Sequence, residues 1–187
     1  MNYLTILHSG KGIPYAPNTH DDGERNYGFR RLKGRLDAIE DIPEAREDGS
    51  LRRLLLAANH ATTAVFTAGC LSMPISSEKG FRRTGYVEFV LNDTKAVASA
   101  ANYFPPFFNF SRLWHQQQGD LNAHLAWEIQ PAFFEDLGLS GFTCAVVVNT
   151  DFHPSQEIAD ECWAGCLELL GTLFTSIRLR REGQPIY

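Results

Sequence analysis

Aromatic side chains crowd around two adjacent prolines between Asn102 and His115, and this segment restricts the possible folds more than any other. A proline lacks the backbone donor and blocks the preceding helical turn. Neither a continuous helix nor a central strand is therefore expected to run through Pro105 and Pro106. Rings at this density have to be covered, either by the chain's own core or by another molecule. The sequence leaves both explanations open.

Binding through this aromatic segment is one of the two explanations. Its surface would meet a protein partner, a second copy of the chain or an apolar ligand. The surplus of apolar surface favours a homodimer. The side chains that would make the contact are Tyr103, Phe104, Phe107, Phe108, Phe110 and Trp114.

Length and charge narrow the class of protein. The chain has 187 residues, 44% of them hydrophobic, which suits one domain with a substantial core. Its net charge of -5 argues against general nucleic-acid binding, which needs clustered positive charge. No apolar run reaches the roughly 18 residues of a membrane span, and residues 1–8 lack the basic lead of a secretory signal. We expect a single cytoplasmic domain, residues 1–187, without membrane contact.

The four cysteines lie in apolar stretches rather than at the loop spacings of a disulfide framework. Cys70, Cys144, Cys162 and Cys166 are therefore predicted to be reduced. Cys162 and Cys166 share one face of a predicted helix, where such a pair can bind a metal or respond to oxidation. The apolar residues on the same face favour burial in the core instead. No metal and no cofactor is expected.

The first third of the chain is predicted to contain a strand, an irregular segment and two helices. The strand covers residues 3–8. Residues 9–28 are rich in Gly, Pro, Asn and Asp, and an irregular loop or arm of this length is usually functional or mobile. Helical periodicity runs from Phe29 to Ile39, with Gly34 weakening its centre. Ser50 is expected to cap a second helix.

Strand and helix patterns alternate in the rest of the chain. The predicted strands cover residues 63–73, 84–91, 122–130 and 142–149, with a turn over residues 131–141. The predicted helices cover residues 94–104 and 154–177, the second having acids at its start and arginines beyond its end. This order predicts an α+β fold: one domain with a largely antiparallel sheet of about four or five strands, packed by a long C-terminal helix and by N-terminal helices.

Four polar residues are weak candidates for catalysis. Asp151 and His153 join an apolar strand to the last helix, where they can act as a base and its orienting partner, although helix capping explains them equally. His124 and Glu128 share one face of a strand and suit acid–base chemistry, but half-exposed strands routinely carry such residues. Together the four would line a cleft.

A basic run from Arg25 to Arg35 holds five positive residues and no acid. Such a local reversal of charge can attract an anionic partner, with Arg30 and Arg31 as the binding residues. The alternative is the solvated outer face of a helix.

The sequence therefore favours a non-enzymatic cytoplasmic protein-binding domain, of the chaperone, adaptor or immunity class, acting as a homodimer through its aromatic segment. The alternative is a small enzyme or small-ligand-binding domain with a cleft lined by His124, Glu128, Asp151 and His153. The sequence leaves an enzymatic role open.

Overall fold

One mixed sheet organises the protein. The computed structural model describes residues 2–19, 25–117, 121–179 and 182–187. The sheet has six strands in the order β1-β7-β8-β6-β5, with β2 paired to β7 as well. β1 and β2 run parallel to β7, and the other neighbours are antiparallel. The six strands are β1 (Asn2–Ile6), β2 (Lys11–Ile13), β5 (Val65–Ser77), β6 (Gly80–Leu91), β7 (Ala123–Phe134) and β8 (Leu139–Thr150).

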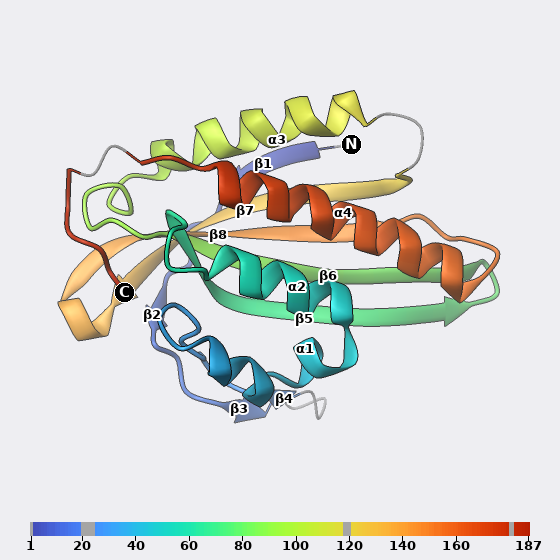
Figure 1. The fold of residues 1–187 in the computed structure, drawn as a ribbon, viewed down its shortest axis with the longest axis horizontal. Helices are drawn as coiled ribbons and strands as arrows, with labels where there is room; N and C mark the ends of the chain where they lie inside the picture. The colour runs from blue at the N-terminus through green and yellow to red at the C-terminus, as the bar shows by residue number, and fades with distance from the viewer. Residues whose placement is uncertain (1, 20–24, 118–120, 180–181) are drawn as a thin grey trace.

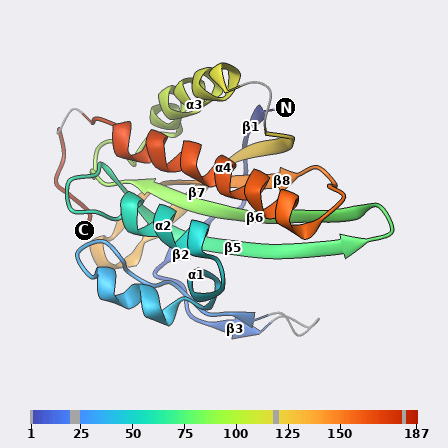
Figure 2. The same cartoon turned by 45° about the vertical axis from the view of Figure 1, so that its right-hand side comes forward.

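Three of the helices, α2, α3 and α4, lie side by side over one face of this sheet, with α4 in the middle (Figures 1 and 2). The predicted α+β domain with a long C-terminal helix is confirmed, and the sheet has one strand more than expected. A separate small ribbon is formed by β3 (Asn18–Thr19) and β4 (Arg25–Asn26). The helices and helical turns are η1 (Leu36–Asp41), α1 (Pro43–Glu47), α2 (Gly49–Ala58), η2 (Ala100–Tyr103), α3 (Phe104–Gln116), η3 (Glu135–Leu137) and α4 (Gln156–Ser176).

The main core lies between these helices and the sheet. Alternate residues of β7 point toward the helices, and Trp127 among them is fully buried. Its indole contacts the rings of Phe89, Phe107 and Phe110, with ring centres 5.5 to 5.9 Å apart. Edge-to-face and tilted contacts of this kind add to the stabilisation from apolar burial. The aromatic segment is thus part of the packing that holds α3 on the sheet.

The predicted helix over residues 29–39 is wrong. Residues 29–35 contain no helix, and η1 forms only after them. Gly34 takes a left-handed conformation with φ of 76°, which ends a right-handed helix. Lys33 is 4% exposed, and its ammonium donates to the carbonyl oxygens of Thr63 and Val65 at the edge of β5. This tertiary contact overrides the local helical pattern.

The two adjacent prolines, Pro105 and Pro106, lie at the start of a helix. α3 begins at Phe104, so Pro105 and Pro106 occupy its first turn, where a missing N–H group costs no hydrogen bond. The helix predicted over residues 94–104 is wrong, since turns and η2 occupy that stretch. β7 continues through Pro131, so the chain turns four residues later than predicted, at η3.

A buried carboxylate begins α2. Asp48 is 6% exposed, and its Oδ1 accepts hydrogen bonds from the backbone N–H groups of Ser50 (2.9 Å) and Leu51 (3.0 Å). These bonds satisfy donors that the first turn of a helix cannot pair internally. The predicted cap at Ser50 is therefore displaced to Asp48.

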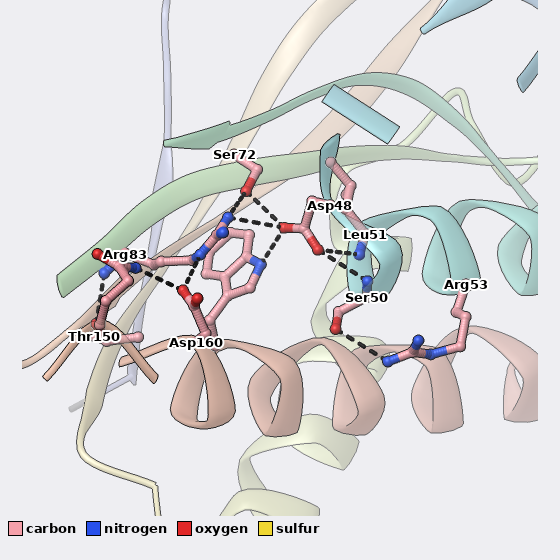
Figure 3. A network of polar contacts seen from close by, with 10 residues as sticks. Asp48, Ser50, Leu51, Arg53, Ser72, Arg83, Thr150 and Asp160 are labelled. Atoms are coloured by element: carbon pink, nitrogen blue, oxygen red, sulfur yellow. Dashed lines mark hydrogen bonds and ion pairs between the residues drawn. The ribbon is translucent and has the colours of Figure 1, made fainter. Parts of the chain in front are cut away.

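The other oxygen of the same carboxylate joins α2 to α4 and to the β5–β6 hairpin (Figure 3). Asp48 Oδ2 accepts from Ser72 Oγ and Trp163 Nε1, both at 2.7 Å, and from Arg83 Nη1 at 3.2 Å. Arg83 also donates from Nε to Asp160 Oδ1 at 2.5 Å. Burial raises the pKa of Asp48, but these hydrogen bonds and the Arg83 charge outweigh it and hold the pKa below its usual value.

Replacing Asp48 with asparagine removes the charge and one acceptor while keeping the shape of the side chain. We expect Asp48→Asn to lower the free energy of unfolding by about 2–4 kcal/mol, because Arg83 and Trp163 lose a buried anionic partner. Urea denaturation measures this change. Asp37→Asn, at an exposed acid in η1, is the matched control and should change stability by no more than about 0.5 kcal/mol. Equal effects of the two variants would contradict the role assigned to Asp48.

The Asp48 carboxylate also predicts a pH dependence. Its pKa is lowered in the folded state, so its stabilising contribution is complete above the unfolded pKa of about 3.9 and is lost as the pH falls through the folded pKa. The difference in unfolding free energy between the natural chain and Asp48→Asn should therefore be constant from neutral pH down to about pH 5 and narrow below about pH 4. Urea titrations at several pH values test this, and a difference unchanged at the lowest pH would refute it.

Candidate functional site

The aromatic segment is mostly interior. Tyr103 and Phe110 are fully buried, and the Tyr103 hydroxyl donates to the carbonyl oxygen of Phe142. Phe108 is 66% exposed, while the remaining rings of the segment are half-buried. Those half-buried rings are Phe104, Phe107 and Trp114. Of the six aromatic residues predicted to bind, only Phe108 projects freely from the surface.

A pair of substitutions separates the core rings from the exposed ring. Phe110→Ala is expected to lower the free energy of unfolding by about 3–5 kcal/mol, because it leaves a cavity beside Trp127. Phe108→Ala should change it by no more than about 0.5 kcal/mol. Both are measured by urea denaturation. If Phe108→Ala proved as costly as Phe110→Ala, the assignment of Phe108 to the surface would fail.

The structure brings two of the four polar candidates together. His124 Nε2 lies 3.1 Å from Asp151 Oδ1, and both side chains are more than half exposed. Glu128 lies four residues further along the same face of β7, with Ala126 between it and His124. The backbone of His153 pairs with Phe81 of β6 through hydrogen bonds of 2.7 and 2.9 Å. None of the four lines the cavity described below.

The imidazole of His153 lies instead beside the start of α4. The hydrogen bond with Cys166 and the nearby imidazole lower the pKa of the Cys162 thiol, although burial raises it. Cys162 is only 5% exposed, and its Sγ lies 3.4 Å from the carbonyl oxygen of Asn122. The two cysteines of α4 are therefore part of the packed interior, and all four cysteines of the chain are free thiols.

The two predicted binding arginines have different surroundings. The guanidinium of Arg31 lies 4.4 Å from the ring centre of Tyr187, a cation–π contact within the chain. Arg30 is exposed, and its Nη1 donates to the carbonyl oxygen of Phe29 at 3.2 Å. The two side chains therefore do not form one anion-binding patch.

The face of the sheet that points away from α2, α3 and α4 carries an apolar row. The ladders place five residues directly opposite one another across five strands, in the order Tyr3, Ala126, Val147, Tyr86 and Leu71. None of α2, α3 and α4 covers this row, whereas α1 lies beside its Leu71 end (Figures 1 and 2). We use the term open face for it and the two flanking rows, which are Thr5, Glu128, Ala145, Glu88 and Gly69 on one side and His124, Asn149, Thr84 and Met73 on the other.

The open face is only partly shielded from water. Tyr3 is 52% exposed and Met73 is 38% exposed, at opposite edges of the sheet. Val147, Tyr86 and Leu71 are half-buried. Further along the same side of the sheet, a second apolar cluster is covered by β2 and by the C-terminal residues. The chain therefore covers one end of this face and leaves the other end uncovered.

Charge on the open face is acidic. The buried carboxylate of Glu88 pairs with the ammonium of Lys11, and Asp151 pairs with His124. Glu128 is half-buried, and its carboxylate has no hydrogen bond or ion pair with another described residue. The three rows contain no lysine and no arginine. An acid without a partner thus lies beside the apolar row.

A cavity of about 210 Å³ adjoins the open face at the edge of β5. The backbone of residues 67–71 forms one wall, where the β5–β6 ladder has a bulge between Thr67 and Gly69. A Cβ atom at Gly69 would lie 2.9 Å from the Tyr15 hydroxyl oxygen, so this approach requires glycine. We use the term tyrosine pocket for this cavity, whose polar lining includes Tyr15, Tyr27, Tyr86, Asp41, Glu44 and Arg30.

Acidic groups dominate the electrostatics of the tyrosine pocket. Burial raises the pKa of Tyr86 to about 12, and the charges of Glu88 and Glu44 add to the rise. Burial and the charge of Glu44 raise the pKa of Cys70 to about 12 in the same way. The pKa of Tyr15 is also raised, first by burial and then by its neighbours, including both glutamates. The phenols and the thiol are neutral at pH 7, and the potential around them disfavours anions.

No motif in the sequence predicts the tyrosine pocket. Its residues come from segments that are far apart in the sequence, among them those of Tyr15, Glu44 and Tyr86. The only signal was the long irregular stretch over residues 9–28, which supplies Tyr15 and Tyr27. Residues 20–24 of that stretch lie outside the described residues.

A scan against protein-family models and searches of curated proteins and of solved structures gave no match to this chain. Within the described ranges, no group of three or more His, Cys, Asp or Glu side chains is placed to hold a metal ion. Nor does any helix in these ranges combine the length and apolar character needed to cross a bilayer. Function is therefore inferred from the geometry and charge of the open face and the tyrosine pocket.

Proposed function

We propose that this chain is a non-enzymatic, cytoplasmic protein-binding domain whose open face receives a partner protein. The apolar row from Tyr3 to Leu71 carries the proposal. The face of an antiparallel sheet that meets only water is normally polar, whereas Val147 and Ala145 at the centre of this face are apolar and half-exposed. Ala126 within the row is buried, whereas Tyr3 is exposed and Val147, Tyr86 and Leu71 are half-exposed, and apolar residues exposed on neighbouring strands in this way are typical of interaction sites. A chaperone, an adaptor or an immunity protein would bind its partner through such a surface.

Charge indicates which kind of partner fits the open face. In a homodimer, each copy of the chain would bring its Glu128 carboxylate into the interface. The three rows contain no lysine or arginine that could pair with these two carboxylates. Burying an unpaired carboxylate costs several kcal/mol. A partner of different sequence, with an apolar patch and a lysine or arginine opposite Glu128, avoids this cost. The net charge of -5 adds a long-range attraction for a basic protein.

Two further observations support this assignment. None of the four polar candidates for catalysis lines the tyrosine pocket, and His124 and Asp151 pair at an exposed position instead, which favours binding over an acid–base role. The four cysteines are free thiols, as is usual for proteins of the reducing cytoplasm.

Placing a charge in the apolar row is expected to abolish partner binding. With the full chain as bait in an extract of its own cells, Val147→Glu should reduce recovery of the partner about tenfold or more, because a central contact of the interface becomes an unpaired charge. Quantitative mass spectrometry of the bound fraction measures the change. Ile158→Glu is the matched control, since Ile158 is an exposed apolar residue on α4, on the helical side. Urea denaturation establishes that both variants are folded.

Two outcomes would contradict this proposal. One is equal recovery of every captured protein by Val147→Glu and Ile158→Glu. The other is a dimer in light scattering that Val147→Glu dissociates, because the open face would then belong to a second copy. A monomer is the expected state of the isolated chain.

A further inference from the structure

We infer that the tyrosine pocket is a binding site for an organic cation, namely an alkylammonium or guanidinium group. This inference goes beyond the proposed function and rests on the pocket alone. Val147, on which the test of the open face depends, does not line the pocket. The two proposals can therefore fail separately.

The size of the pocket limits the ligand to a small group. Its volume is about 210 Å³. An engineered apolar cavity of about 150 Å³ accommodates benzene, whereas pockets for drug-sized molecules range from about 300 to 1,000 Å³. The pocket thus fits the end of a long side chain or a small amine, and it is too small to enclose a nucleotide.

The charge of the lining selects a cation. Glu44 is half-buried, and its carboxylate makes no hydrogen bond or ion pair with another described residue. Its charge nevertheless raises the pKa of Tyr86 and of Cys70, so it acts across the cavity. Asp41, an exposed acid, lies at the same wall. An incoming ammonium group would pair with a carboxylate that the fold leaves without a counter-charge.

Among the described residues, the cations near this wall offset only part of its negative charge. Lys11 lies 5.6 Å from the ring centre of Tyr15, but its ammonium is engaged by Glu88. Arg30 lines the pocket from an exposed position and donates to a backbone carbonyl. Its single positive charge offsets one of the two acids Asp41 and Glu44, so the described lining keeps one negative charge in excess.

The rings of the lining suit a cation as well. The faces of aromatic rings carry negative potential, and cages of aromatic rings are a common means of recognising organic ammonium groups. Tyr15, Tyr27 and Tyr86 line the pocket from the N-terminal segment and from β6. The Tyr86 hydroxyl has no hydrogen-bond partner among the described residues, so its oxygen can accept from an ammonium or guanidinium N–H.

Titration of the full chain with matched small probes tests the site. The probes are butylammonium and butylguanidinium, with butanol as the uncharged analogue and butanoate as the anion. We expect both cations to cause saturable shifts in the backbone amide NMR signals of Gly69 and Cys70 at pH 7, while butanol and butanoate cause none at equal concentration and ionic strength. Equal shifts with butanol or butanoate would overturn the inference.

A second experiment replaces Glu44 with glutamine, which has nearly the same shape and no charge. Glu44→Gln should weaken butylammonium binding about fivefold or more, because a half-buried charged hydrogen-bond acceptor is lost. Glu47→Gln is the matched control, since Glu47 is exposed on the same short helix and does not line the pocket. It should change the affinity by no more than about twofold. Equal weakening by the two variants, or by neither, would overturn the inference.

A third arm identifies the source of the cation. A pentapeptide with blocked ends and a central lysine among glycines carries the same ammonium group as butylammonium. Binding of the peptide about tenfold more tightly than butylammonium assigns the pocket to a lysine side chain of a polypeptide, whereas tighter binding of butylammonium assigns it to a free amine. The inference would be overturned if the lysine peptide bound no more tightly than the same peptide with glutamine in place of lysine, and butylammonium also caused no shift of the NMR signals.

Discussion

The Asp48 carboxylate is the interaction on which the arrangement of this protein depends. Its two oxygens accept hydrogen bonds from donors in α2, β5, β6 and α4, so one side chain links four elements. Apolar packing is nearly non-directional, whereas a carboxylate with several fixed donors specifies one orientation. The backbone N–H of Asp48 also donates to the carbonyl oxygen of Glu44 at 2.9 Å. The residue that fixes α2 thus also fixes the wall of the tyrosine pocket.

The second determinant of the site is that the helices cover one face of the sheet only. α2, α3 and α4 all pack on the side of Trp127, so among the described residues the opposite side is covered in part, by β2, Phe29 and the C-terminal residues. The open face and the tyrosine pocket both follow from this asymmetry. They share Tyr86, which belongs to the apolar row and lines the pocket. Two different surfaces for recognition therefore adjoin one another.

The elements that were predicted correctly are those whose pattern is local. β7 alternates between apolar and polar residues, β8 is a continuous apolar run and α4 carries a wide apolar stripe, so the local pattern alone identified them. The wrong predictions of secondary structure result from contacts between segments that are distant in the sequence. Lys33 satisfies carbonyl groups at the edge of β5 instead of extending a helix. Pro131 is tolerated in β7 at the point where β1 has ended and β2 has not begun.

The candidate site was less predictable than the fold, for a related reason. The sequence identified the apolar character of β8, but only the three-dimensional arrangement shows that one face of this strand is open. Tyr15, Glu44 and Tyr86 are brought together by the bulge in β5 and by the position of α1, neither of which leaves a periodic signal.

The Lys33 ammonium has a consequence for how the protein behaves in a crowded cell. An outer strand with unpaired N–H and C=O groups is a template on which further chains can assemble into fibrils. At the start of β5, Lys33 occupies the carbonyl oxygens of Thr63 and Val65, and the Asn59 side chain occupies the N–H group of Thr67. Strand-by-strand polymerisation cannot begin there. The chain can therefore expose apolar residues on its sheet while the first residues of one edge strand, β5, are protected against amyloid growth.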